Sequence, residues 1–182
     1  DFSAVLQAHR TATSDGMRAL LATALGRTET AEAVDPLVKD LDDPSQRVKI
    51  AAILALGHLK KSPASLPLLK IAISGDGVLA PIARSTLGRL DPSSLVFITE
   101  AWPHFNPRER ESAIQALANV NGEKVDELLV AQLQDGSPRV ALTAAVVLAQ
   151  RGSGAGRALA QNRLASDDPA VAGMARQVLD VL

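Results

Sequence analysis

Apolar residues recur along this chain at helical spacing, and the pattern itself recurs at a long fixed interval. Six segments end in the same way: RALLATALG, KIAAILALG, APIARSTLG, ESAIQALAN, ALTAAVVLA and GMARQVLD. Their aligned leucines lie 31, 31, 30, 31 and 31 residues apart and are Leu25, Leu56, Leu87, Leu117, Leu148 and Leu179. A register held over six copies indicates internal repeats of about 31 residues.

Each repeat ends in a helical pattern, here called the inner helix, that leads up to the aligned leucine. Four positions before the leucine stand Leu21, Ala52, Ala83, Ala113, Ala144 and Ala175. Eight positions before it stand Met17, Val48, Leu79, Glu109, Val140 and Val171. Because these positions share one side of an α-helix, the spacing predicts one buried face.

A column of capping residues marks the start of each inner helix. Eleven positions before the leucine stand Ser14, Ser45, Asp76, Asn106, Ser137 and Asp168. Their side-chain oxygens can accept hydrogen bonds from the first backbone N–H groups of a helix. In three repeats a proline follows directly, at the first helical position, where it is tolerated: Pro107, Pro138 and Pro169.

A second helical pattern, the outer helix, precedes each cap. Fifteen positions before the leucine stand Leu41, Ala72, Trp102, Leu133 and Leu164. Nineteen positions before it stand Leu37, Leu68, Ile98, Leu129 and Ala160. Two helices per repeat predict an all-α fold. Since such a pair cannot bury its apolar faces alone, the repeats must stack into a solenoid.

The sequence VKIAAILALG, which follows the acidic-proline turn LDDPSQR, resembles HEAT repeats. It is most similar to the short variety found in phycobilisome lyase subunits and in many bacterial proteins. The resemblance covers nearly the whole chain and implies a right-handed α-α superhelix of about five to six two-helix repeats, an armadillo-like solenoid. Residues 1–182 are therefore expected to form a single domain. Three residues depart from the pattern: Glu109 replaces an apolar residue, and Arg84 and Arg176 replace an alanine.

Two features at the ends of the sequence predict that it is a fragment of a longer chain. It begins at Asp1 and not at Met, and its last repeat ends in VLDVL without a polar cap.

Three of the four aromatic residues fall within FITEAWPHFNPRERE. The repeat register places Trp102 in a core column, beside the small Ala72 of the preceding repeat, so we expect it to be buried. Phe97 falls at a half-buried position. Phe105 aligns with turn residues, so we expect its ring to pack locally against the turn; the alternative is an exposed aromatic that could contact a partner.

Composition excludes several classes of function. The net charge is −1, which predicts no general attraction to nucleic acid or anionic membranes. No run of 18 apolar residues occurs, so no membrane span is expected. The chain has no cysteine, which removes disulfides, thiolate catalysis and cysteine-ligated zinc. That absence does not fix the compartment, although the cytoplasm is slightly favoured.

Nothing in the sequence assembles a catalytic or metal site, and we expect no enzyme activity and no cofactor. The three histidines, His9, His58 and His104, share no helical face, and each is expected at the surface. The glycine-rich segment RGSGAGR at 151–157 follows no strand, so it predicts a turn between two helices of one repeat and not a phosphate-binding loop.

Basic residues recur near the starts of the inner helices: Arg18, Arg47, Lys49, Arg108, Arg110 and Arg139. Stacking would line them along one edge, which could contact phosphates. Aspartates fall in the same turns: Asp15, Asp42, Asp43, Asp76 and Asp135. We therefore expect a ladder of arginine–aspartate pairs that cancels the field, and nucleic-acid binding is not favoured.

The resemblance implies that the inner helices line a concave face, and the register identifies the residues pointing out of it. They are Arg47, Ile50, Leu54, His58, Ser85, Arg89, Arg108, Glu111, Gln115, Arg139, Leu142, Val146 and Gln150. Apolar residues framed by arginine and polar groups are typical of interaction surfaces. A neighbouring helix from the rest of a longer parent chain, covering the apolar members, would explain them equally well.

The sequence therefore predicts a protein-binding module or scaffold with a partner segment in its concave groove. Two alternatives stay open. The resemblance to phycobilisome lyases implies a lyase-like or chaperone-like subunit, which would need a bilin or a dedicated partner. The basic edge implies a weak phosphate- or nucleic-acid-binding domain. Binding of a small molecule is not favoured.

Overall fold

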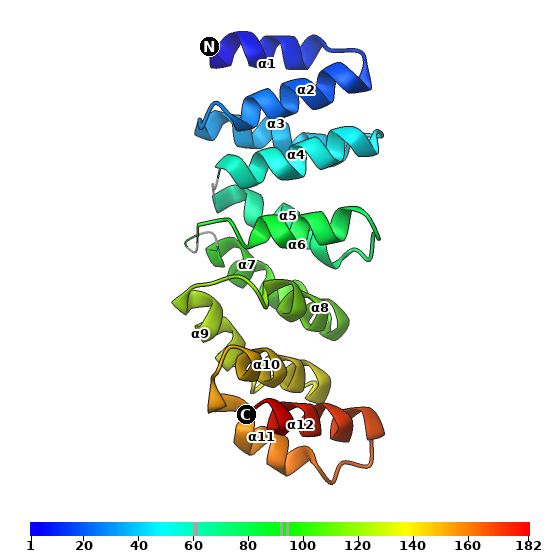
Figure 1. Ribbon diagram of the computed structural model, residues 1–182, viewed down its shortest axis with the longest axis vertical. Coiled ribbons are helices and arrows are strands. Elements are labelled where there is room, and N and C mark those ends of the chain that lie inside the picture. Colours follow the sequence, from blue (N-terminus) through cyan, green and yellow to red (C-terminus); the bar gives the residue numbers. More distant parts are fainter. Residues whose placement is uncertain (60–61, 92, 94) are drawn as a thin grey trace. The chain divides into compact units, whose positions relative to one another are not determined.

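The structure is a computed structural model that describes residues 1–59, 62–91, 93 and 95–182. Within these ranges every regular element is a helix, which confirms the all-α class (Figure 1). The α-helices are α1 Phe2–Thr11, α2 Asp15–Gly26, α3 Val34–Asp40, α4 Gln46–Leu59, α5 Ser65–Ile73, α6 Leu79–Leu87, α7 Leu95–Ala101, α8 Pro107–Leu117, α9 Glu123–Gln132, α10 Pro138–Gln150, α11 Arg157–Arg163 and α12 Pro169–Val181. Short 3₁₀ turns are η1 Ala31–Ala33, η2 Ser62–Ala64, η4 Trp102–His104 and η5 Gly154–Gly156.

The chain divides into two compact units, Asp1–Glu100 and Ala101–Leu182. In the first unit the inner helices α2, α4 and α6 pack side by side, and the outer helices α1, α3 and α5 each pack on the inner helix that follows (Figure 1). In the second unit α10 packs between α8 and α12, with α9 against α10 and α11 against α12. Each unit is thus a stack of HEAT-like two-helix repeats. The expectation of one domain over 1–182 stays a prediction.

The core lies along the columns that the repeat register predicts. All the aligned leucines except Leu179 are buried, as are five of the six residues four positions before them. The two exceptions, Leu21 and Leu179, lie on α2 and α12, and each of these helices packs against one inner neighbour. Two residues of other columns are also exposed: Met17 on α2 by 49% and Leu164, after α11, by 38%.

Four of the six predicted caps accept hydrogen bonds from backbone N–H groups through their side chains: Ser14, Asp76, Asn106 and Asp168. The N–H groups of Leu79 and Val78 also lower the pKa of Asp76. Ser137 occupies the N-cap position of α10 without a side-chain bond. Instead, its own N–H donates to Asp135, 2.8 Å away.

Glu109, which departs from the apolar column, has a structural role at the start of α8. Its carboxylate accepts from the Asn106 N–H at 2.8 Å, while its own N–H donates to the Asn106 side chain at 3.0 Å. This reciprocal capping box satisfies two N–H groups that a helix start leaves unpaired. The polar residue therefore stabilises the helix end and does not weaken the core.

Neighbouring inner helices in the first unit approach closely at a glycine after the aligned leucine. A Cβ built on Gly26 would lie 2.7 Å from the Cα of Ala55, and one on Gly57 would lie 2.7 Å from a Thr86 methyl carbon. Such distances are below van der Waals contact, so only glycine fits there without a shift. The glycine after Leu25 and Leu56 in the repeat pattern therefore sets how close α2, α4 and α6 can pack.

The aromatic residues of the second unit form one buried cluster. Trp102 is 8% exposed, as predicted, and its indole Nε1–H donates to the side-chain oxygen of Gln132 at 2.8 Å. Phe105 is only 9% exposed, which confirms the expected local packing, and the alternative of an exposed aromatic is wrong. Its ring packs edge-on against Trp102 at 5.8 Å between centroids. The turn after η4 directs the ring inward, which a repeat alignment cannot show.

Candidate partner-binding face of the inner helices

Four of the predicted face residues come together in the second unit. The first turns of α8 and α10 border a hollow of about 440 Å³, here called the charged hollow. It is lined by Pro107, Arg108, Glu111, Ser112, Gln115, Ser137 and Arg139. The prediction had grouped Arg108, Glu111, Gln115 and Arg139 from their register alone, and the structure places all four around one space.

One ion pair crosses the charged hollow. Arg139 donates to Glu111 through Nε at 3.2 Å and through Nη2 at 2.9 Å. These hydrogen bonds and the Glu111 charge raise the pKa of Arg139, and the Asp168 charge raises it further. Partial desolvation lowers it, but by less. The Arg108 side chain is exposed and forms no ion pair with any of the described residues. The lining therefore keeps one unneutralised positive charge.

A second hollow, of about 280 Å³, opens further along the same helices. It is lined by Gln115, Ala118, Thr143, Val146, Val147, Gln150, Met174 and Gln177. Three exposed glutamines surround an apolar floor, so we call it the amide hollow. Gln115 borders both hollows, and together they are named the α8–α10 groove.

The structure corrects the prediction for Leu142 and refines it for Val146. Leu142 is completely buried, in a cluster with Val171, Ala175 and other residues beneath α12. Val146 is 9% exposed but still lines the amide hollow. Both are buried because α12 packs on α10, and every residue from 140 to 149 is buried. The helix that covers them is α12 of this chain, and not one from a longer parent chain as the alternative had it.

In the first unit the predicted face residues lie on α4 and α6. Arg47, His58, Ser85 and Arg89 are exposed, Ile50 is half-buried, and Leu54 is 42% exposed. The register missed Leu20 on α2, which is 63% exposed. It stands five positions before the aligned leucine, a position that the face pattern did not include.

Arginine–aspartate pairs join successive repeats, as the predicted ladder requires. Arg18 donates two hydrogen bonds to Asp43 at 2.9 and 3.2 Å, and Arg110 donates two to Asp135 at 2.8 and 3.2 Å. Each arginine also donates to a carbonyl just before its own helix, that of Thr13 or of Phe105. We call this arrangement the arginine clasp.

The clasp also organises the turn that it reaches. Asp43 accepts from the Ser45 N–H and Asp135 from the Ser137 N–H, both at 2.8 Å. Burial alone would raise the pKa of Asp43. The hydrogen bonds from Arg18 and Ser45, with the Arg18 and Lys49 charges, outweigh burial and hold that pKa below its usual range. Both clasp arginines are thus neutralised, which removes them from the predicted basic edge.

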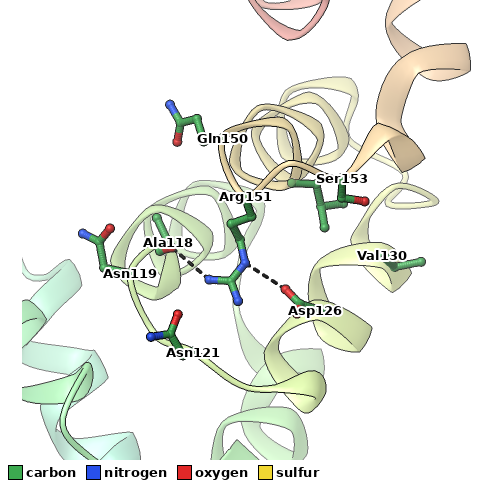
Figure 2. A pocket seen from close by; sticks show the side chains of 9 residues that line it. Ala118, Asn119, Asn121, Asp126, Val130, Gln150, Arg151 and Ser153 are labelled. Atoms are coloured by element: carbon green, nitrogen blue, oxygen red, sulfur yellow. Dashed lines mark hydrogen bonds and ion pairs between the residues drawn. The ribbon is translucent and has the colours of Figure 1, made fainter. Parts of the chain in front are cut away.

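A further hollow in the second unit, of about 670 Å³, is built around Arg151 (Figure 2). The Arg151 guanidinium donates to Asp126 at 2.8 Å and to the carbonyl oxygens of Ala118 and Val120 at 3.0 and 2.9 Å. Asn119 and Gln150 point away from it in Figure 2. Through these three contacts Arg151 holds the loop after α8 in place.

His9 is not at the surface, so its prediction is wrong. Its Nε2 lies 2.7 Å from a carboxylate oxygen of Asp40, and the side chains are 9% and 10% exposed. The two residues occupy the same position in successive repeats, so outer helices α1 and α3 bring them together. His58 and His104 are exposed, as expected.

The described residues hold no cluster of three or more histidine, aspartate or glutamate side chains that could bind a metal ion. None of the helices within the described ranges is long and apolar enough to cross a membrane.

The RGSGAGR segment forms a turn and η5 between α10 and α11, as predicted. Gly156 is buried there, where a Cβ would lie 2.5 Å from that of Ala145.

No curated protein matches the sequence. The chain is similar to solved structures at low sequence identity, two of which follow. An engineered protein, a Northeast Structural Genomics Consortium target, is 20% identical over 100% of this chain and 96% of its own, with a TM-score of 0.49. Human deoxyhypusine hydroxylase in complex with glycerol is 17% identical over 99% and 83%, with a TM-score of 0.43.

A family model described as HEAT repeats matches residues 2–87 and 95–180. The match confirms the resemblance to HEAT repeats, while the closer similarity to phycobilisome lyase subunits stays a prediction. The helix pairs, the buried leucine columns and this match all point to the same family, and the chain belongs to the HEAT-repeat proteins.

Proposed function

We propose that this protein is a repeat scaffold that binds a segment of a partner protein in the α8–α10 groove. The observation that carries the proposal is that two hollows, both bordered by Gln115, lie along α8 and α10. Their lining combines arginine, exposed amides and an apolar floor, which is the mixture found in protein interfaces. The exposed α4 and α6 residues of the first unit are proposed as additional contacts.

Several features favour a binding scaffold over the alternatives. Membership of the HEAT-repeat family suggests a non-enzymatic scaffold. Of the six residues in the predicted basic edge, Arg18, Arg110 and Arg139 are committed to carboxylates. Phosphate recognition needs free cations, and these three are engaged within the chain.

The test blocks the groove without touching the core. Gln115 is exposed and borders both hollows, so Gln115→Trp should fill the groove and leave the fold intact. Gln161, exposed on the outer helix α11, provides the matched control Gln161→Trp. A protein captured by the native chain is identified by mass spectrometry, purified, and titrated against all three forms by calorimetry.

We expect the captured protein to bind the native chain and Gln161→Trp equally and Gln115→Trp at least about tenfold more weakly, as for loss of a central interface contact. Circular dichroism must show the same helix content in all three. Equal affinity for Gln115→Trp and the native chain would exclude the α8–α10 groove as the binding site.

A further inference from the structure

We propose that the segment bound in the α8–α10 groove carries a carboxylate side chain and, about three residues away, an apolar side chain. This inference rests on the proposed function and specifies the chemistry of its partner. The carboxylate meets Arg108 in the charged hollow, and the apolar side chain enters the amide hollow.

The charge of the lining selects the carboxylate. Glu111 receives both of its hydrogen bonds from Arg139, so its negative charge is already balanced. Asp168 lies close enough to Arg139 to act on its charge as well. Arg108 is exposed and has no carboxylate partner among the described residues. A planar guanidinium in this position matches a carboxylate in two parallel hydrogen bonds.

The amide hollow suits an apolar side chain on an extended backbone. Its floor is formed by Val146, Val147 and Met174, and methionine adapts to side chains of different shape. The exposed Gln115, Gln150 and Gln177 around it each offer an N–H donor and a carbonyl acceptor. They can therefore pair with the backbone N–H and C=O groups of the bound segment while its side chain fills the floor.

The helix geometry sets the spacing between the two groups. Arg108 and Gln115 are seven residues apart on α8, and Arg139 and Val146 are seven apart on α10. Seven residues of α-helix advance about 10 Å. An extended chain covers about 3.3–3.6 Å per residue, so the same distance takes about three residues of the partner.

The test selects random dodecapeptides displayed on phage against the native protein. Selections against Arg108→Gln, Val146→Thr and Gln115→Trp run in parallel. Arg163 on α11 is also exposed, so Arg163→Gln is the matched control for loss of a surface arginine in the same unit. Selected peptides are then synthesised, and each is also made with glutamine replacing the acidic residue.

We expect the native protein and Arg163→Gln to select Asp or Glu about three residues from Leu, Val, Met or Phe. Loss of the acidic residue or of Arg108 should each weaken binding about two- to fivefold, as for an exposed ion pair, with no further loss when combined. Raising the salt concentration should weaken native binding more than binding to Arg108→Gln. Val146→Thr, which keeps the shape of the side chain but adds a hydroxyl, should weaken the apolar preference.

The other outcomes separate this inference from the proposed function. Peptides that lose binding to Gln115→Trp but show no acidic preference, or bind Arg108→Gln as well as the native chain, would overturn the assignment of the carboxylate and leave the groove standing. Selection of the same peptides by the native protein and by Gln115→Trp, or of none by either, would overturn the groove itself and this inference with it.

Discussion

Arg110 holds Asp135 in the second unit through the same two hydrogen bonds with which Arg18 holds Asp43 in the first. Each pair spans 25 residues and joins the start of one inner helix to the turn before the next. Where the arginine position carries Ala80, the partner position of the next repeat carries His104. The arginine and the aspartate of the clasp therefore occur together in some repeats, and both are replaced in another.

Removing the clasp arginine should destabilise the second unit. The Asp135 side chain is only 7% exposed, so Arg110→Ala leaves a nearly buried carboxylate without its partner. We expect a loss of about 1.5–3 kcal/mol in the free energy of unfolding, the value for hydrogen bonds to charged groups. Urea denaturation followed by circular dichroism measures it. Arg163→Ala, at an exposed site, should change little, and equal losses in both variants would argue against the clasp.

The first clasp should make the stability of its unit depend on acid. The pKa of Asp43 is lower in the folded chain than in the unfolded one. The carboxylate therefore adds fully to the free energy of unfolding above its unfolded pKa of about 4, and this stabilisation disappears as the pH falls through the folded pKa. Asp43→Asn should be less stable at neutral pH and lose less stability on acidification. Denaturation curves for both proteins between about pH 7 and about pH 3 test this. Parallel pH profiles would contradict it.

The indole hydrogen bond should contribute separately from the bulk of Trp102. Trp102→Phe keeps a ring but leaves the buried Gln132 oxygen without its donor, and should cost about 1–3 kcal/mol. Trp102→Ala should cost about 3–5 kcal/mol as a large truncation. Adding Gln132→Leu to Trp102→Phe should restore part of the loss, since it removes the unpaired group. Thermal denaturation of the three variants decides, and no recovery would show that packing alone matters.

Two glycine substitutions should have opposite effects on stability, because one glycine lies at the close approach of α2 and α4 and the other lies in open space on α12. Gly26→Ala places a methyl group against the Ala55 backbone and should destabilise the first unit by about 1–3 kcal/mol, as overpacking does. Gly173 lies inside α12 with nothing within 4 Å of its added Cβ. Gly173→Ala should stabilise by about 0.5–1 kcal/mol through helix propensity. Unfolding midpoints measure both, and a stabilising Gly26→Ala would refute the close approach.

Two leucines that the sequence placed on one face should behave differently. Leu142 is completely buried, so Leu142→Glu introduces a charge without a partner into the core and should unfold the second unit. Leu54 is 42% exposed, and Leu54→Glu should change stability by no more than about 0.5 kcal/mol. Helix content by circular dichroism separates the two. A folded Leu142→Glu would show that α12 does not cover α10 firmly.

Much of the architecture follows from the repeat register without coordinates. The leucine column, the small residues one helical turn before it and the caps Asn106 and Asp168 are local signals with a fixed spacing. Helical periodicity turns that spacing into a buried face, and stacking is the only way for such pairs to bury it. The same register predicted that Arg108 and Arg139 share one face, and in the structure both line one hollow.

Only the tertiary structure decided which positions of the face are open. Leu142 and Leu54 belong to the same outward-pointing pattern, yet α12 covers one of them and solvent reaches the other. Phe105 is buried against Trp102 across a turn, and the His9 side chain is largely covered where it meets Asp40 of another repeat. Periodicity reports the direction of a side chain from its own helix axis. Burial depends on what packs from outside that helix, and this is information that a single-helix pattern does not contain.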